Sequence, residues 1–283
     1  MATKLAEAIK QFSSLTKAVE VGKCVIFVGS GLSVGAGYKS WEGLIQSLVD
    51  EAKKLPQART KGIEEFEKEK DFFTLADFAR MALGPNQYAA ILRAEYGRKS
   101  NPTAAHIAIA KTTYRGVITT NFDRLLETVF TQVRGWAPND FTPEAVEALA
   151  AALYNPEPFI FKLHGSITTA QSIVLTSRDY DRLILLNPHV RAFLQAIFLN
   201  YTLLFVGYSI RDPDFQLVLR ELTLIFEGYT PTHYALVPNV PDFSVEHLLK
   251  RMNIQTVPYD PHDGYVELTE ALEALRDLAP YQP

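Results

Sequence analysis

Short apolar runs without alternating polar residues are the feature that most limits how this chain can fold. Four of them are rich in β-branched or aromatic residues: Lys23–Val28, Gly116–Thr119, Phe159–Leu163 and Thr202–Val206. Such runs are typical of strands that are buried on both faces, and these strands occur almost only in parallel sheets. Because segments with helical spacing separate the runs, we predict an α/β fold, a Rossmann-like parallel sheet with helices on both faces.

The rest of the pattern places helices before, between and after these strands. Apolar spacing predicts helices at Leu5–Val21, Trp41–Lys54, Thr103–Lys111, Pro143–Leu153, Val190–Leu199, Asp214–Phe226 and Val266–Leu278, and a further helix that begins at Arg124. Short strands are expected at Ile173–Leu175, His233–Val237 and Ile254–Val257. We predict one domain over residues 1–283, with a small inserted helical subdomain at about 60–98, broken at Gly84–Pro85, and a second helical insertion at about 134–158.

Composition argues against several classes of protein. The formal net charge is −4 and lysine and arginine form no cluster, so direct binding of nucleic acid is not expected. Cys24 is the only cysteine, which excludes a disulfide framework and a multi-cysteine zinc site. No apolar stretch reaches the length of a membrane span, and no leader pattern opens the sequence. We therefore expect a cytoplasmic protein that does not engage a membrane.

A glycine-rich stretch follows the first strand and precedes a helix. Its glycines are Gly29, Gly31, Gly35 and Gly37. This context suits a loop whose backbone approaches a phosphate closely. The spacing differs from the dinucleotide fingerprint, because Val34 stands where the third glycine belongs and Asp50 lies inside a predicted helix. The alternative is a tight strand-to-helix turn that holds no ligand.

Polar residues follow the other buried strands at the point where each strand ends. The residues are Thr119, Thr120, Asn121 and Asp123 after the second run, His164, Gly165 and Ser166 after the third, and Gly207, Ser209 and Asp212 after the fourth. In an open parallel sheet the carboxyl ends of the strands share one edge, where ligands bind, so these residues are expected to face one crevice. Each has a structural alternative. Thr120, Asn121, Asp123 and Asp212 can cap the helices that follow, and His164 can be a hydrogen-bonded turn residue.

Five short motifs in order resemble the sirtuin family between Lys23 and Asp260. They are "GSGLS" at Gly29–Ser33, "PTAAH" at Pro102–His106, "TTNFD" at Thr119–Asp123, "HG" at His164–Gly165 and "GYS" at Gly207–Ser209. The chain departs from the deacetylating sirtuins, which carry "GIPDFR" where this chain has "GYKSW" and a zinc ribbon of four cysteines that is missing here. With "LTSRDYDRLI" and "LLFVGYSIRDPDF" it is more similar to the bacterial sirtuin-like branch of anti-phage defence.

This resemblance implies a single sirtuin-like catalytic domain that hydrolyses NAD to nicotinamide and ADP-ribose without zinc. By resemblance, Asn121 would bind the nicotinamide ribose and position a water molecule, and His164 would act as general base. The remaining candidate residues for binding NAD are Gly29, Ser30, Gly31, Ser33, Thr120, Asp123, Gly207 and Ser209. Among these, the Gly29–Ser33 loop would hold the pyrophosphate and Asp123 the nicotinamide carboxamide. His106 is interpreted as structural.

Two other functions stay open at the level of sequence. A protein deacylase would use the same site, but the missing zinc ribbon speaks against it. A non-catalytic module that binds NAD or ADP-ribose and controls a partner would need neither Asn121 nor His164. The resemblance also implies a homo-oligomer and a co-encoded sensor, ATPase or Argonaute-like partner, because uncontrolled loss of NAD would kill the host cell.

Overall fold

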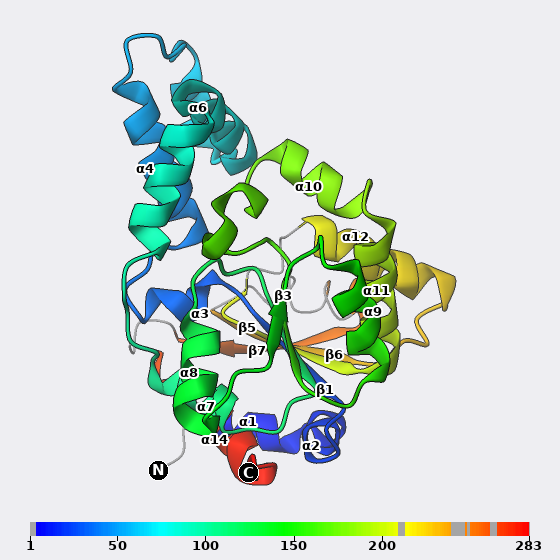
Figure 1. The fold of residues 1–283 in the computed structure, drawn as a ribbon. Coiled ribbons are helices and arrows are strands. Elements are labelled where there is room, and N and C mark those ends of the chain that lie inside the picture. The colour runs from blue at the N-terminus through cyan, green and yellow to red at the C-terminus, as the bar shows by residue number, and fades with distance from the viewer. Residues whose placement is uncertain (1–3, 209–212, 239–246, 248–249, 261–264, 283) are drawn as a thin grey trace.

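The computed structural model describes residues 4–208, 213–238, 247, 250–260 and 265–282, and it confirms the predicted α/β fold. A seven-stranded sheet has the order β3-β4-β2-β1-β5-β6-β7, and every neighbouring pair of strands is parallel (Figure 1). The strands are β1 (Cys24–Val28), β2 (Gly116–Thr119), β3 (Asn139–Phe141), β4 (Phe159–Lys162), β5 (Thr202–Val206), β6 (His233–Pro238) and β7 (Ile254–Tyr259). The chain builds outward from β1 through β2, then crosses to the other side of β1 at β5, which creates a switch point where such sheets bind ligands.

Helices cover both faces of this sheet. One face carries α1 (Lys4–Gln11), α2 (Ser13–Glu20), α7 (Ala104–Ala110), α8 (Leu125–Arg134) and α14 (Val266–Leu278). The other face carries α9 (Val146–Tyr154), α10 (Ser177–Ile184), α11 (Pro188–Asn200) and α12 (Pro213–Ile225). Among the described residues, no single helix is long and apolar enough to cross a membrane. The pair α10 and α11 meets these criteria only when taken together, and the two helices are bent by 71° relative to each other.

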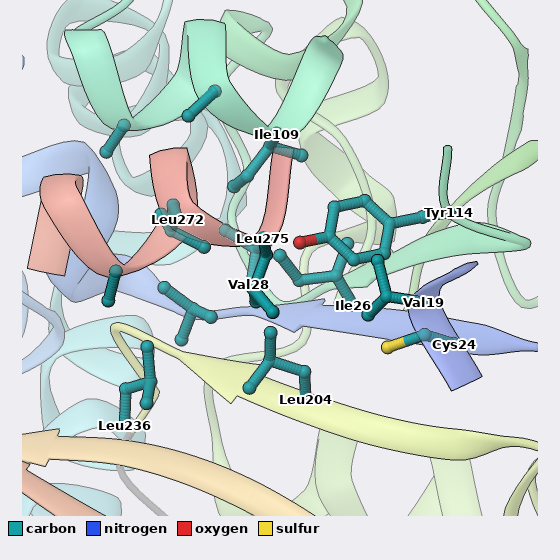
Figure 2. Packing of buried hydrophobic residues seen from close by; sticks show 14 of the residues in the cluster. Val19, Cys24, Ile26, Val28, Ile109, Tyr114, Leu204, Leu236, Leu272 and Leu275 are labelled. Carbon is teal, nitrogen blue, oxygen red and sulfur yellow. The ribbon is translucent and has the colours of Figure 1, made fainter. Parts of the chain in front are cut away.

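Burial on both faces explains why the strand sequences do not alternate. Every residue of β1 is buried. Ile26 and Val28 pack toward α7 and α14 in the cluster shown in Figure 2, whereas Val25 and Phe27 pack on the opposite face of the sheet. Each such side chain contributes roughly 1.5–3 kcal/mol when it is fully buried. Both faces therefore select for apolar residues at every position of the strand.

A third group of helices forms a layer that stands beyond the sheet, at the upper left of Figure 1. It consists of α4 (Trp41–Lys53), α5 (Ile63–Glu69) and α6 (Phe72–Tyr96), which share one apolar cluster. Phe122 and Ile167, which follow β2 and β4, belong to the same cluster, so this helical layer packs on the carboxyl ends of the strands. The predicted break is confirmed: Gly84 has φ 69° and ψ 169°, and Pro85 follows it.

Two local predictions differ from the structure, and two elements, β3 and α10, were not predicted. The predicted helix over Leu5–Val21 is two helices, because Phe12 leaves the helical conformation with ψ 81°. Ile173–Leu175 is not a strand, since Ile173 and Leu175 pack into the cluster of the helical layer. Strand β3, which pairs with β4, was not predicted within segment 134–158. Helix α10 was not predicted; Thr176 and Asp179 cap it reciprocally. The division of the chain into one domain with insertions stays a prediction.

Candidate active site

A pocket of about 740 Å³ lies at the carboxyl ends of the strands, between their loops and the helical layer. Its lining residues are Ser30, Ser33, Lys39, Trp41, Glu42, Glu69, Lys70, Asp71, Phe72, Phe73, Tyr96, Thr120, Asn121, Phe122, Asp123, His164, Tyr180 and Tyr208. The strand-end loops supply most of its small polar groups, and the helical layer supplies aromatic and charged groups. A volume between about 300 and 1,000 Å³ is usual for pockets that take small molecules and cofactors.

The structure brings six of the ten predicted site residues to this pocket: Ser30, Ser33, Thr120, Asn121, Asp123 and His164. Three predicted glycines, Gly29, Gly31 and Gly207, are not among the lining residues. Ser209 and the predicted helix cap at Asp212 lie outside the described residues. The crevice predicted from the polar strand ends is thus formed by loops after β1, β2, β4 and β5.

The glycines of the first loop make room for another part of the backbone. A Cβ on Gly29 would lie 2.5 Å from the carbonyl oxygen of Gly207, and one on Gly31 would lie 2.8 Å from the same atom. Gly207 itself has φ +60°, which favours glycine. The N–H groups of Gly29 and Gly31 donate to the carbonyl oxygens of Val206 and Gly207. These glycines therefore have a packing role, and their predicted contact with NAD stays a prediction.

The side-chain amide and the main-chain N–H of Asn121 both donate hydrogen bonds, which hold the residue rigidly. Its Nδ2 donates to the carbonyl oxygen of Gly29 at 3.0 Å and to Oγ of Ser33 at 2.9 Å, and its main-chain N–H donates to Oγ1 of Thr119 at 3.0 Å. Because a carbonyl oxygen can only accept, the orientation of the amide is fixed. Oδ1 of Asn121 is buried and has no hydrogen-bond partner within the described ranges. This acceptor can receive a hydrogen bond from a ligand hydroxyl or from water.

Asp123 connects the same hydrogen-bonded chain to a helix. Its Oδ2 accepts from Oγ of Ser33 at 2.7 Å, and its Oδ1 accepts from the N–H of Leu125, the first residue of α8, at 2.9 Å. The capping alternative is therefore realised for Asp123, and the carboxylate also orients Ser33. One carboxylate oxygen thus positions Ser33, which holds Asn121, and the other fixes the start of α8.

His106 has a structural role, as interpreted from the sequence. Its Nδ1 accepts from the N–H of Thr103 at 3.2 Å and so helps to cap the start of α7. Burial lowers the pKa of His106 to about 4, and the nearby charge of Asp123 opposes part of that shift. A neutral imidazole that caps a helix is not a candidate for proton transfer in the pocket.

His164 lines the pocket directly after β4. The side chain is buried, and its ring meets that of Tyr180 at 5.0 Å between centroids with an interplanar angle of 75°. Gly165 follows with φ +83°, and its added Cβ would lie 2.3 Å from the carbonyl oxygen of Ser172, so the chain must turn sharply there. The turn leaves the imidazole in the same pocket as Asn121, where it can accept a proton.

Sequence reasoning missed an aromatic wall, formed by Trp41, Phe72, Phe73 and Tyr180. The ring centroids of Trp41 and Phe73 are 5.3 Å apart, and those of Phe73 and Tyr180 are 5.0 Å apart at 90°. The wall therefore runs from α4 and α6 to α10 and ends at His164. The adjacent pair Phe72–Phe73 was the available signal, but nothing in the sequence says which way this pair faces.

Comparisons with known proteins agree with this architecture. The family model of the SIR2-like domain matches residues 115–257. The chain is 28% identical to "NAD(+) hydrolase ThsA" of Bacillus cereus (strain MSX-D12), over 95% of this chain and 56% of that protein. It is 27% identical to the protein of the same name from Cytobacillus dafuensis, over 92% of this chain and 49% of that protein. "Defense-associated sirtuin 2" of Bacillus subtilis is 25% identical over 76% of this chain and 20% of that protein. The chain thus spans about half the length of the curated ThsA relatives it matches.

Proposed function

The chain belongs to the SIR2-like domain family, and from this premise we propose that it hydrolyses NAD to nicotinamide and ADP-ribose. The observation that carries the proposal is the meeting of Asn121 and His164 in one pocket, with the Asn121 amide locked so that Oδ1 is left to accept. The similarity to proteins named NAD(+) hydrolase supports the same reaction. In this proposal NAD is the substrate, and no zinc takes part.

The proposed reaction breaks the bond between the ribose carbon and the nicotinamide nitrogen. The electron pair of that bond leaves with nicotinamide, which departs as a neutral molecule, so the reaction needs no acid on the leaving group. A water molecule then bonds to the electron-deficient ribose carbon and loses a proton to His164. Oδ1 of Asn121 accepts a hydrogen bond from this water or from a ribose hydroxyl, which orients the attack. A general base of this kind typically contributes about 100- to 10,000-fold in rate.

The other predicted site residues are assigned different roles in binding NAD. We propose that Ser30, the first residue of α3 (Ser30–Val34), and Thr120, which follows β2, hydrogen-bond the riboses and the pyrophosphate. Gly29, Gly31 and Gly207 hold the loop in place, and Ser209 stays a predicted contact. Asp123 acts mainly through Ser33 and Asn121, because its two oxygens already accept from Ser33 and Leu125.

Turnover of NAD in the absence of any peptide tests the proposal. Purified protein is incubated with NAD, and nicotinamide and ADP-ribose are separated by chromatography. We expect His164→Ala to lower turnover about 100- to 10,000-fold with little change in melting temperature. The matched control is His189→Ala, because His189 is exposed, and this variant is expected to keep wild-type turnover. Equal turnover in His164→Ala and wild type would refute the role of His164.

Binding is measured separately from turnover. The chain has two tryptophans, Trp41 in the pocket wall and Trp136, which is 42% exposed. In a Trp136→Phe background, we expect NAD to change the fluorescence of Trp41. Binding without turnover would favour the non-catalytic module, and turnover that requires an acylated peptide would favour the deacylase.

We further propose that this activity serves bacterial defence against phage, in the cytoplasm and under control of other chains. The similarity to a protein named for defence supports this context. A homo-oligomer and a co-encoded sensor, ATPase or Argonaute-like protein would restrain the enzyme until infection. Light scattering on the pure protein, and NAD turnover with and without the co-encoded protein, test this control. A monomer with full turnover on its own would refute it.

A further inference from the structure

A buried ion pair lies behind the turn that carries Asn121. Lys162 on β4 and Glu127 on α8 are 1% and 3% exposed, and Nζ of Lys162 donates to Oε1 of Glu127 at 3.2 Å. Neither residue lines the pocket. Burying a lysine removes it from water at a considerable free-energy cost, so a buried lysine calls for a specific partner.

The same ammonium group also holds the main chain of the turn. Nζ of Lys162 donates to the carbonyl oxygen of Asp123. The neighbouring carbonyl oxygen, that of Phe122, accepts from the N–H of Ile167 at 3.0 Å. Two successive carbonyls of the β2–α8 turn are therefore fixed by residues that flank His164 on the β4 segment. The hydrogen bond from the ammonium group is charge-assisted, and such bonds are stronger than those between two neutral groups.

The register of the strands makes this contact relevant to the site. Lys162 is paired with Thr119 at the ends of β4 and β2, and His164 and Asn121 each lie two residues beyond this pair, in the turns that follow the strands. The lysine thus connects the segment that carries His164 to the segment that carries Asn121. Without the ammonium group, the carbonyl of Asp123 would lose its partner and the turn would be free to shift relative to His164.

We propose that Lys162 is a positioning residue for the NAD hydrolysis proposed above: it sets the placement of Asn121 relative to His164, and Glu127 holds the lysine side chain in place. The inference rests on the proposed function. A misplacement of reacting groups by about 1 Å can lower a rate by roughly 100-fold. We therefore expect loss of the lysine to lower kcat by roughly 10- to 100-fold and to change KM much less, since the aromatic wall and the loop after β1 are unchanged.

Two variants separate positioning from folding. Lys162→Met/Glu127→Leu replaces the pair by apolar side chains of similar size, which is often neutral or favourable for stability, but it removes the contact with the Asp123 carbonyl. Glu127→Leu alone leaves an unpaired buried charge, which destabilises the fold, but it keeps that contact. We expect the double variant to be the more stable and the slower of the two. If Lys162 had a purely structural role, the less stable variant, Glu127→Leu, would instead have the lower kcat.

The controls use the same assay. Glu127→Gln keeps an acceptor for Nζ and should retain wild-type kcat, and it replaces Glu127→Leu if that variant does not fold. Arg191→Met/Glu221→Leu removes an ion pair between α11 and α12, outside the pocket lining, and should leave kcat unchanged. A double variant at Lys162 and Glu127 that folds and keeps kcat within threefold of wild type overturns the inference. Absence of NAD turnover in the wild-type chain, both alone and with the co-encoded protein, would instead refute the proposed function.

Discussion

Acidification should destabilise this protein through a histidine buried in the sheet. His233 opens β6 and is fully buried, and its Nδ1 accepts from the N–H of Leu203 at 3.2 Å. Burial lowers the pKa of His233 from 6.5 to about 3. Below pH 6.5 the unfolded chain takes up a proton at this position and the folded chain does not. The contribution to stability is therefore complete above pH 6.5 and is lost as the pH falls from 6.5 toward 3.

The size of the effect follows from the two pKa values. At pH 5 the unfolded state gains about 2 kcal/mol from protonation of His233, because one pH unit corresponds to about 1.4 kcal/mol. Urea unfolding at pH 7.5 and at pH 5 measures the change in the free energy of unfolding. In His233→Gln, whose side-chain carbonyl can still accept from Leu203, the loss between these pH values should be about 2 kcal/mol smaller than in wild type. The control His189→Gln alters an exposed histidine and should leave the loss unchanged. Equal losses in His233→Gln and wild type would refute the reasoning.

Two further predictions concern the strand-end loops. Gly31→Ala should destabilise the protein by about 1–3 kcal/mol in the same urea assay, because its Cβ would lie 2.8 Å from the Gly207 carbonyl oxygen. Gly35→Ala, whose Cβ meets only ordinary contacts of 3.5 Å or more, is its matched control and should not destabilise. Ser33→Ala should lower NAD turnover by roughly 10-fold or more, by analogy with other misplaced groups, because it breaks the link between Asn121 and Asp123; wild-type turnover in this variant would contradict the proposed role of the link.

The central part of the fold could be predicted from the sequence because its strands are buried on both faces. β2 and β5 begin and end where the apolar runs Gly116–Thr119 and Thr202–Val206 do. The edge strand β3 was missed, since only Phe141 of its three residues is buried and the pattern carries almost no apolar signal. The break at Phe12 was missed for the opposite reason: the apolar spacing continues through it, although the backbone does not.

The two halves of the pocket differ in the same way. The polar half could be predicted because parallel strands end at one edge, so Asn121 and His164 must be neighbours once their strands are identified. The aromatic wall could not be predicted, because the position of Trp41 and Phe73 depends on how α4 and α6 pack against the strand-end loops. The role of the glycines was also hidden, since the close approach comes from Gly207, which is far away in the sequence.

The pairing of β2 with β4 fixes the backbone spacing at the base of the pocket. Adjacent strands lie about 4.8 Å apart, and the N–H of Leu163 donates to the carbonyl oxygen of Thr119 at 2.8 Å at the end of the pair. The backbone spacing where β2 and β4 end is thus inherited from the sheet, and the turns that carry Asn121 and His164 start from it.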